Sequence, residues 1–239
     1  MGLSSKEFIF FGTKKEAEFY RLKEILINNH KLSCEQYKAY LEKFEKLSDE
    51  SPLIRQHYYL FKTQTLQDKK DISELCEKAL RITLPGFNMR DITKYRLSWT
   101  EMTLLTVWIN SIAFSEDHYD APYYFQQLYQ YSNGADFELL WKKNHLSAIL
   151  SKYIRYLGEN KMYPTLLARM RQWDFSCCDF NLFRKLNMHY YRSQAYLSIN
   201  ETKKAKQNHD MAVALATVLD NSLALKKLQA QLSDIQAND

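Results

Sequence analysis

The sequence contains very little glycine and proline: five Gly and four Pro among 239 residues. These two residue types form most tight turns, and folds made of many short strands need them repeatedly. Glycine-rich loops that hold phosphate groups need them as well. Their scarcity argues against a β-sandwich and against a nucleotide-binding loop fold. It favours an all-α protein, whose long helices are joined by few turns.

The common motifs of catalysis and metal binding are also missing. None of the six His residues lies in a His-Glu-x-x-His spacing, and no Ser lies in a G-x-S-x-G context. The four Cys residues fit no zinc pattern, and the adjacent pair Cys177 and Cys178 is poorly placed for a disulfide. We therefore expect no metal, no cofactor and no catalysed reaction. An enzyme whose site leaves no motif is the weakest of three hypotheses.

Long hydrophobic runs and a strong charge of one sign are absent too. No apolar run approaches the roughly 20 residues that span a bilayer, and the run near the start covers only residues 8–11. This predicts a cytoplasmic protein with reduced thiols and no membrane contact. The net charge of +5, from 33 basic and 28 acidic residues, is too small to demand a nucleic-acid partner.

The stretch 79–114 shows how the chain is organised. Leu84-Pro85-Gly86 is expected to end one helix, because Pro lacks the N–H group and Gly tolerates the turn. Ser98 is expected to start a long helix, with Glu101 completing a capping box. The apolar residues that share one face of this helix are Leu104, Leu105, Trp108, Ile112 and Ala113.

This order of a short helix, a break and a long capped helix recurs along the chain. The long helices are expected to begin near Ser98, Asp136, Asn181 and Ser222, with Gly158 closing the second. A period of roughly 40 residues is typical of stacked helix–turn–helix repeats. We predict an all-α fold of TPR-like helical-hairpin repeats, stacked into a curved right-handed solenoid. One domain over 1–239 would comprise N-terminal helices (1–50), repeat hairpins (51–221) and a C-terminal helix (222–239).

The best-defined repeat unit runs from residue 190 to residue 219. Small residues at regular positions would let its two helices approach closely: Ala195, Ala205, Ala212 and Ala216. In stacks of this kind the first helix of each pair lines the concave face. We therefore look for binding residues on the long first helices.

The central stretch resembles the C-terminal domain of Rgg/MutR transcriptional regulators of Gram-positive bacteria, which are of the RRNPP type. The resemblance depends on Ala79 to Phe87, on Leu97-Ser98 with Glu101, and on Asn110 to Ala113. The opening Leu3 to Phe8 is similar to the segment that follows the DNA-binding domain in that family. Order and spacing together carry the resemblance, which extends over essentially the whole chain.

The resemblance implies a repeat domain that forms a homodimer and binds a short hydrophobic signalling peptide on its concave face. In the family this domain follows an N-terminal helix-turn-helix that binds a promoter. No such module precedes Met1 in this sequence. Promoter DNA is therefore expected as a partner only through an N-terminal domain absent from this chain. The chain is either an isolated sensor domain or a naturally shortened relative.

A peptide in a helical groove needs polar partners for its backbone and apolar walls for its side chains. Asn110 offers both donors and an acceptor, although without the family resemblance a solvated or core-bonded Asn would be the better interpretation. Arg155 and Arg192 are equally suited to clamping a peptide carboxylate and to a plain surface role. The candidate groove walls, for which core packing is the commoner role, are Trp108, Tyr153, Tyr190 and Tyr191.

The last helix carries an apolar seam with spacings of three and four: Leu225, Leu228, Leu232 and Ile235. Two roles fit this seam equally, capping the last repeat or packing against its mate in a two-fold dimer.

The sequence as a whole predicts the peptide-sensing and dimerisation domain of an Rgg-type quorum-sensing regulator. Peptide binding would favour one arrangement of the repeats over another. The alternative function is a helical-repeat scaffold that binds a partner protein and has no signalling peptide.

Overall fold

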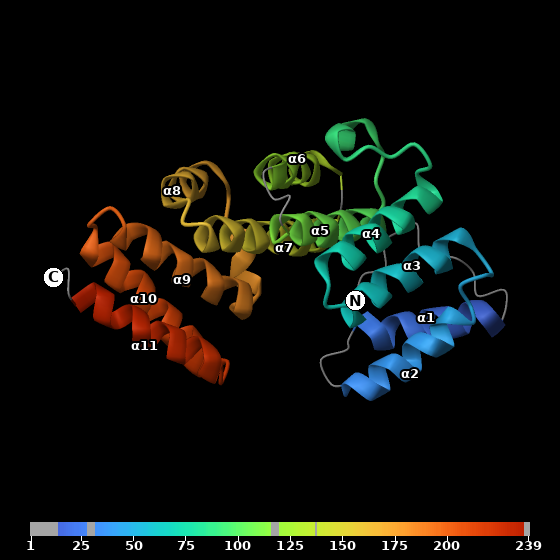
Figure 1. Ribbon diagram of the computed structural model, residues 1–239, viewed down its shortest axis with the longest axis horizontal. Coiled ribbons are helices and arrows are strands. Elements are labelled where there is room, and N and C mark those ends of the chain that lie inside the picture. The colour runs from blue at the N-terminus through green and yellow to red at the C-terminus, as the bar shows by residue number, and fades with distance from the viewer. Residues whose placement is uncertain (1–13, 28–31, 116–119, 137, 237–239) are drawn as a thin grey trace. The chain divides into compact units, whose positions relative to one another are not determined.

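The computed structural model describes residues 14–27, 32–115, 120–136 and 138–236, and every regular element within these ranges is helical (Figure 1). The predicted all-α class is therefore confirmed. The chain divides into two compact units, Met1–Leu128 and Tyr129–Asp239. The curved right-handed solenoid and the single domain over 1–239 stay predictions. The opening Leu3 to Phe8, which carried part of the family resemblance, lies outside the described residues.

The first unit is a series of helices in which each of the first five packs against its neighbour along the chain. Its helices are α1 (Lys14–Ile27), α2 (Cys34–Glu45), α3 (Pro52–Lys62), α4 (Lys69–Thr83), α5 (Trp99–Ala113) and most of α6 (Ala121–Gly134). Short 3₁₀ helices cover Thr63–Thr65 and Met89–Lys94. The core between α1, α2 and α3 is rich in aromatic rings, among them Phe19, Phe44 and Phe61.

The central stretch has the helix ends that its sequence predicts. Helix α4 ends at Thr83, directly before the Leu84-Pro85-Gly86 break. The Ser98 hydroxyl accepts from the Glu101 N–H at 3.3 Å, and the Ser98 N–H donates to the Glu101 carboxylate at 2.6 Å. This is a complete capping box. It explains why α5 begins immediately after Ser98.

Glu101 also belongs to a buried polar network that joins three helices. Its carboxylate accepts a hydrogen bond from the Thr83 hydroxyl of α4 at 2.5 Å. The Thr83 oxygen in turn accepts from Nε2 of Gln56, on α3, at 2.7 Å. Gln56 and Glu101 are both buried, and buried polar groups that find partners fix the relative position of the elements that carry them.

The second unit is assembled around α9 (Leu182–Leu197), which packs against α7 (Leu139–Glu159), α8 (Tyr163–Gln172), α10 (Thr202–Val218) and α11 (Ser222–Gln236). A 3₁₀ helix covers Ser176–Phe180. The small residues predicted to bring α9 and α10 together are all fully buried: Ala195, Ala205, Ala212 and Ala216.

Helix α7 begins three residues after Asp136, near which its start was predicted, and it does not close at Gly158. Glu138 is the N-cap residue, without a side-chain cap bond, so Asp136 does not cap this helix. At the other end the helix continues to Glu159, and Gly158 lies inside it. The absent side chain serves packing, because a Cβ atom at Gly158 would lie 2.1 Å from Cδ1 of Tyr191 on α9. Gly158 thus sets how closely α7 and α9 approach.

Three turns of the second unit use a residue in the left-handed region that is not glycine: Lys161 (φ 54°), Asn200 (φ 57°) and Asp220 (φ 50°). After each of them the next N–H closes back on the preceding helix, as from Met162 to the Leu157 carbonyl at 2.8 Å. This bond is typical of the Schellman motif, in which glycine is the usual left-handed residue.

Replacing Lys161 by Gly is expected to stabilise the protein by about 0.5–1 kcal/mol. A left-handed residue with a Cβ atom costs roughly 1–2 kcal/mol, and the greater freedom of glycine in the unfolded chain removes part of the gain. Urea denaturation at neutral pH measures the difference. The matched control is Lys206→Gly on the exposed face of α10, expected to destabilise by about 1 kcal/mol. Equal effects of the two changes would show that the Lys161 backbone is unstrained.

Candidate functional site

Two adjoining hollows lie beside α9 and α11 in the second unit. The first has a volume of about 220 Å³ and is lined by α9 and α11, and the second has about 330 Å³ and adds α8. Tyr190 and Lys227 line both hollows, so we treat them as one feature and call it the α9–α11 groove. Ligand pockets usually measure about 300–1,000 Å³, so the groove suits a short segment of a ligand rather than a large cofactor.

Gln231 of α11 lines the second hollow and is only 5% exposed. Both of its amide atoms, Nε2 and Oε1, are buried and have no hydrogen-bond partner among the described residues. A buried polar group without a partner costs about 1–3 kcal/mol. Gln231 therefore buries an unused donor and an unused acceptor beside the groove.

The other polar groups of the groove differ from Gln231. Nε2 of Gln194 donates to the Tyr190 hydroxyl at 3.1 Å, so those two side chains are partnered. Burial raises the pKa of Tyr190 and of Tyr163 above the ordinary tyrosine value, so both hydroxyls stay protonated at neutral pH. Lys227 is exposed and forms no ion pair with a described residue. The groove thus combines one uncompensated positive charge with neutral polar groups.

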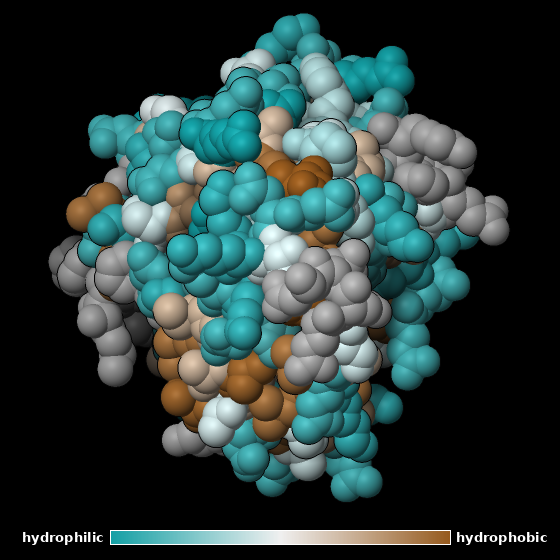
Figure 2. Space-filling view, turned by 90° about the vertical axis from the view of Figure 1, so that its left-hand side faces the viewer, coloured by the Kyte–Doolittle hydropathy of each residue, from teal (hydrophilic) through white to brown (hydrophobic). Residues whose placement is uncertain are grey.

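Large apolar side chains are exposed next to the groove. Phe183 is 56% exposed and Leu223 is 66% exposed, and both line the first hollow. Leu182 and Val218, at the start of α9 and the end of α10, are 41% and 73% exposed. On the face seen in Figure 2, hydrophobic surface gathers toward the lower part while hydrophilic surface covers most of the rest. Exposed apolar clusters of this kind mark binding surfaces.

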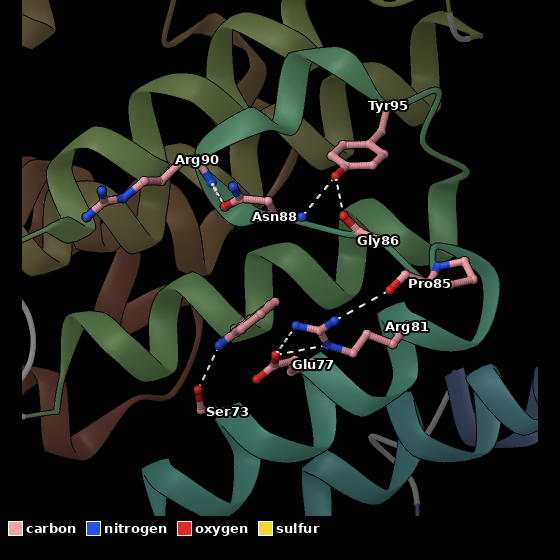
Figure 3. A network of polar contacts seen from close by, with 9 residues as sticks. Ser73, Glu77, Arg81, Pro85, Gly86, Asn88, Arg90 and Tyr95 are labelled. Atoms are coloured by element: carbon pink, nitrogen blue, oxygen red, sulfur yellow. Dashed lines mark hydrogen bonds and ion pairs between the residues drawn. The ribbon is translucent and has the colours of Figure 1, made fainter.

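Two of the predicted site residues lie on α5 of the first unit. Trp108 is half-buried, and its Nε1–H donates to the Ser73 hydroxyl of α4 at 2.7 Å. Figure 3 shows Ser73, Glu77 and Arg81 on successive turns of α4, and Glu77 and Arg81 form an ion pair. Asn110 is half-buried, and its amide makes no hydrogen bond with a described residue. Trp108 therefore takes part in packing against α4, and a peptide-binding role of Trp108 and Asn110 stays a prediction.

The other predicted residues lie in the second unit, where Tyr190 lines both hollows of the α9–α11 groove and Tyr191 borders the first. Tyr153 is 1% exposed and packs against the Trp173 ring at 5.3 Å, so it belongs to the core. Arg155 is exposed and pairs with Glu159 at 2.8 Å. Arg192 is half-buried, and its Nε has no hydrogen-bond partner among the described residues. The peptide-binding role of the whole set stays a prediction.

Tyr191, the remaining candidate wall, also faces inward for the most part. Its ring covers Gly158, and its hydroxyl donates to the Glu159 carboxylate at 3.1 Å. It borders the first hollow with only 8% of its surface exposed. Tyr191 therefore mainly joins α9 to α7.

The apolar seam of α11 is used at least in part within the chain. Leu228 is 1% exposed and forms a cluster with Leu186 of α9 and the alanines of α10, and Leu225 packs against that cluster. Ile235 is also buried, and Leu232 is half-buried. This placement is the one expected of a capping helix. A homodimer contact through the seam stays a prediction.

The sequence itself indicates that Gln231 is a polar residue on a buried helix face. Gln231 lies three residues after Leu228 and four residues before Ile235, so it shares the buried face of α11. A polar residue on the inner face of an amphipathic helix needs a partner. Lys227 and the exposed Phe183 carry no comparable signal, because lysines and single apolar residues are common on helix surfaces.

The described residues hold no group of three His, Cys, Asp or Glu side chains placed to bind a metal ion. Besides His209 on α10, two further histidines are buried among the described residues, His57 on α3 and His145 on α7. Nε2 of His57 contacts the Thr100 hydroxyl at 3.2 Å, whereas Nε2 of His145 has no partner among the described residues. Burial, with a smaller effect of a nearby positive charge, lowers the pKa of each imidazole to about 4. Both are therefore neutral at neutral pH.

All four cysteines are free thiols, of which Cys34 is exposed and Cys76, Cys177 and Cys178 are buried. None of the described helices is long and apolar enough to cross a bilayer.

Comparison with known proteins gives a similarity of fold. The chain is similar to the competence regulator ComR from Streptococcus vestibularis, solved in complex with its cognate signalling peptide XIP. The TM-score is 0.51 at 16% sequence identity, and the match covers 91% of this chain and 97% of that chain. No protein-family model matches the sequence, and no curated protein matches it. At this identity the similarity establishes a shared TPR-like helical fold.

Proposed function

We propose that this chain is the peptide-sensing domain of a transcriptional regulator and that it binds a short hydrophobic signalling peptide. The observation that carries the proposal is the similarity of fold to ComR, whose solved structure contains its signalling peptide. The α9–α11 groove supports it from this chain's own residues, because apolar side chains stand beside an unpaired buried amide. The match covers nearly the whole of both chains, so the proposal concerns the full helical array.

The finer predictions belong to the same proposal. An Rgg-type regulator would place the peptide on the concave face of a curved right-handed solenoid and would form a homodimer. Its promoter would be bound by an N-terminal helix-turn-helix domain. Peptide binding would act by favouring one arrangement of the helices, and it can shift that equilibrium only by its difference in affinity for the two arrangements.

A second function is favoured by one observation, the exposed apolar residues near the groove. Phe183 and Leu223, which line the first hollow, are each more than half exposed. A helical-repeat scaffold would use such a cluster to hold a folded partner protein. This scaffold function would need no extended peptide and no buried amide to receive it.

Affinity selection with synthetic peptides tests the proposed function. The purified chain would be mixed with a pool of short peptides made of Leu, Ile, Val, Phe and Gly, and with a matched pool of hydrophilic peptides. Mass spectrometry of the retained peptides is expected to show members of the hydrophobic pool only. Each retained peptide is expected to raise the melting temperature, because it binds the folded state. Retention of neither pool, or of both pools equally, would contradict peptide sensing.

A further inference from the structure

We propose that the α9–α11 groove binds the carboxyl-terminal end of an extended hydrophobic peptide, with Gln231 pairing with the peptide backbone and Lys227 with the terminal carboxylate. The inference rests on the proposed function and deepens it, since it names the site, the end of the peptide and the groups that read it.

The unpaired amide of Gln231 selects a peptide unit over other ligand groups. Its Nε2 needs an acceptor and its Oε1 needs a donor, and neither finds one among the described residues. A carboxylate or a phosphate supplies acceptors only, so it would leave Oε1 unpaired. An aliphatic group supplies neither. A residue of an extended chain points its own N–H and C=O to the same side, and can therefore satisfy both atoms of the amide.

The same reasoning argues against a folded helical partner in the groove. The backbone N–H and C=O groups of a helix interior are paired within the helix. A second copy of this chain, docking through a helix surface, would thus present no free peptide unit to Gln231. The occupant needs free backbone groups, which an extended segment provides.

Lys227 supplies the second element of recognition. It lines both hollows and has no ion pair among the described residues. Every unmodified peptide carries a carboxylate at its end, and an ammonium group attracts it as a point charge. Lys227 and Gln231 are four residues apart on α11, so their Cβ atoms lie roughly 5–6 Å apart on one face. Two residues of extended chain span a similar length, at most about 3.6 Å each.

The first hollow then receives the side chain of the last peptide residue. Leu223 lies one turn before Lys227 and borders this hollow together with the exposed ring of Phe183. Leu186 and Leu228 form its buried floor. A volume of about 220 Å³ matches one large apolar side chain. The groove thus reads, along α11, a backbone unit at Gln231, a carboxylate at Lys227 and an apolar end residue at Leu223.

Calorimetric titration of matched variants tests the inference. The ligand is a hydrophobic peptide that the wild type retained from the pool, prepared both as the free acid and as the carboxyl-terminal amide. Lys227→Gln is expected to weaken the free acid about five- to tenfold, because a favourable charge contact is lost, and to leave the amide unchanged. Gln231→Leu is expected to weaken both forms by about tenfold or more. Its melting temperature is expected to stay level or rise, because the variant removes an unpaired buried amide.

The chain offers matched controls one and two residues away. Lys226 and Gln229 are exposed on α11 and line neither hollow. Lys226→Gln and Gln229→Leu are therefore expected to bind both peptide forms as the wild type does.

Three outcomes would overturn the inference, and they separate it from the proposed function. If both groove variants bind the peptide with wild-type affinity, the peptide binds elsewhere on the chain, and the proposed peptide-sensing function still holds. Failure of the wild type to retain any hydrophobic peptide would remove the proposed function and the groove assignment together. If Leu223→Glu loses self-association, measured by light scattering, and keeps its peptide affinity, the groove is an interface between copies of this chain.

Discussion

Lowering the pH from 7 to about 4 is expected to reduce the free energy of unfolding by roughly 3 kcal/mol for each of two buried histidines. In the unfolded chain each imidazole takes up a proton near pH 6.5, whereas His57 and His145 in the folded chain do so only near pH 4. The unfolded state therefore binds more protons between these values. The stabilisation is fully present above about pH 6.5 and is lost as the pH falls through that window.

The cause of both pKa shifts is burial, which disfavours the charged imidazolium. Nearby positive charges add to it, Lys23 beside His57 and Arg184 beside His145. Arg184 is held in place by the Asn144 carbonyl, to which its Nη1 donates at 2.8 Å. Lowering a pKa by one corresponds to about 1.4 kcal/mol of free energy, which gives the size of the expected loss of stability.

Urea denaturation at several pH values between 7 and 4.5, followed by tryptophan fluorescence, measures this dependence. Each unit has its own reporters, Trp99 and Trp108 in the first and Trp141 and Trp173 in the second. His57→Gln is expected to flatten the pH dependence seen by the first pair, and His145→Gln that seen by the second. The pKa values of Glu18 and Asp174, lowered by hydrogen bonds to Arg21 and Ser176, are common to the wild type and both variants and cancel when the slopes are compared. An unchanged slope in both variants would show that the two imidazoles titrate normally.

Gly158→Ala is expected to destabilise the second unit by about 2 kcal/mol or more, although alanine is the better helix former by roughly 1 kcal/mol. The added methyl group would overlap the Tyr191 ring, whose Cδ1 lies 2.1 Å from the Cβ position. The ring cannot turn away freely, because it is 8% exposed and its hydroxyl is bonded to Glu159. Either α7 and α9 separate or the ring is displaced from its site.

A double-mutant cycle with Tyr191→Ala isolates this overlap from the helix preference. When the ring is removed, Gly158→Ala is expected to become neutral or stabilising by up to about 1 kcal/mol, as for an ordinary helix position. Thermal or urea denaturation of the four proteins gives the coupling. Equal effects of Gly158→Ala in the two backgrounds would mean that the close approach to Tyr191 does not limit the packing.

Several helix ends were predictable because the capping bonds that define them join residues close together in the sequence. Ser98 and Glu101 lie three residues apart and bond to each other's backbone, so the sequence alone defines the start of α5. Asn181 likewise caps α9, with its side chain accepting from the Arg184 N–H. The prediction that Gly158 closes α7 was wrong for the opposite reason. The role of Gly158 depends on the Tyr191 ring, which is distant in the sequence. The predicted start of α7 near Asp136 was slightly early, because the helix begins at Leu139 with Glu138 as its N-cap residue.

The candidate site was predictable only in part for the same physical reason. Tyr190 was chosen for its position on a first helix and does line the groove, whereas Tyr153 has the same pattern and is buried in the core. Helical periodicity gives the inward face of α7 but not what covers it. The position of Gln231 on the inner face of α11 can be read from the sequence, whereas its lack of a partner depends on α8, α9 and α11 together.

The placement of the four sulfur atoms has a consequence for handling the protein. Cys34 alone is exposed, and the other three thiols are sealed inside one unit or the other. An oxidising preparation of folded chains can thus form covalent pairs through Cys34 and nothing larger. Cross-linked species beyond a pair would require a second sulfur on the same chain, and so would report that one of the helical units had opened.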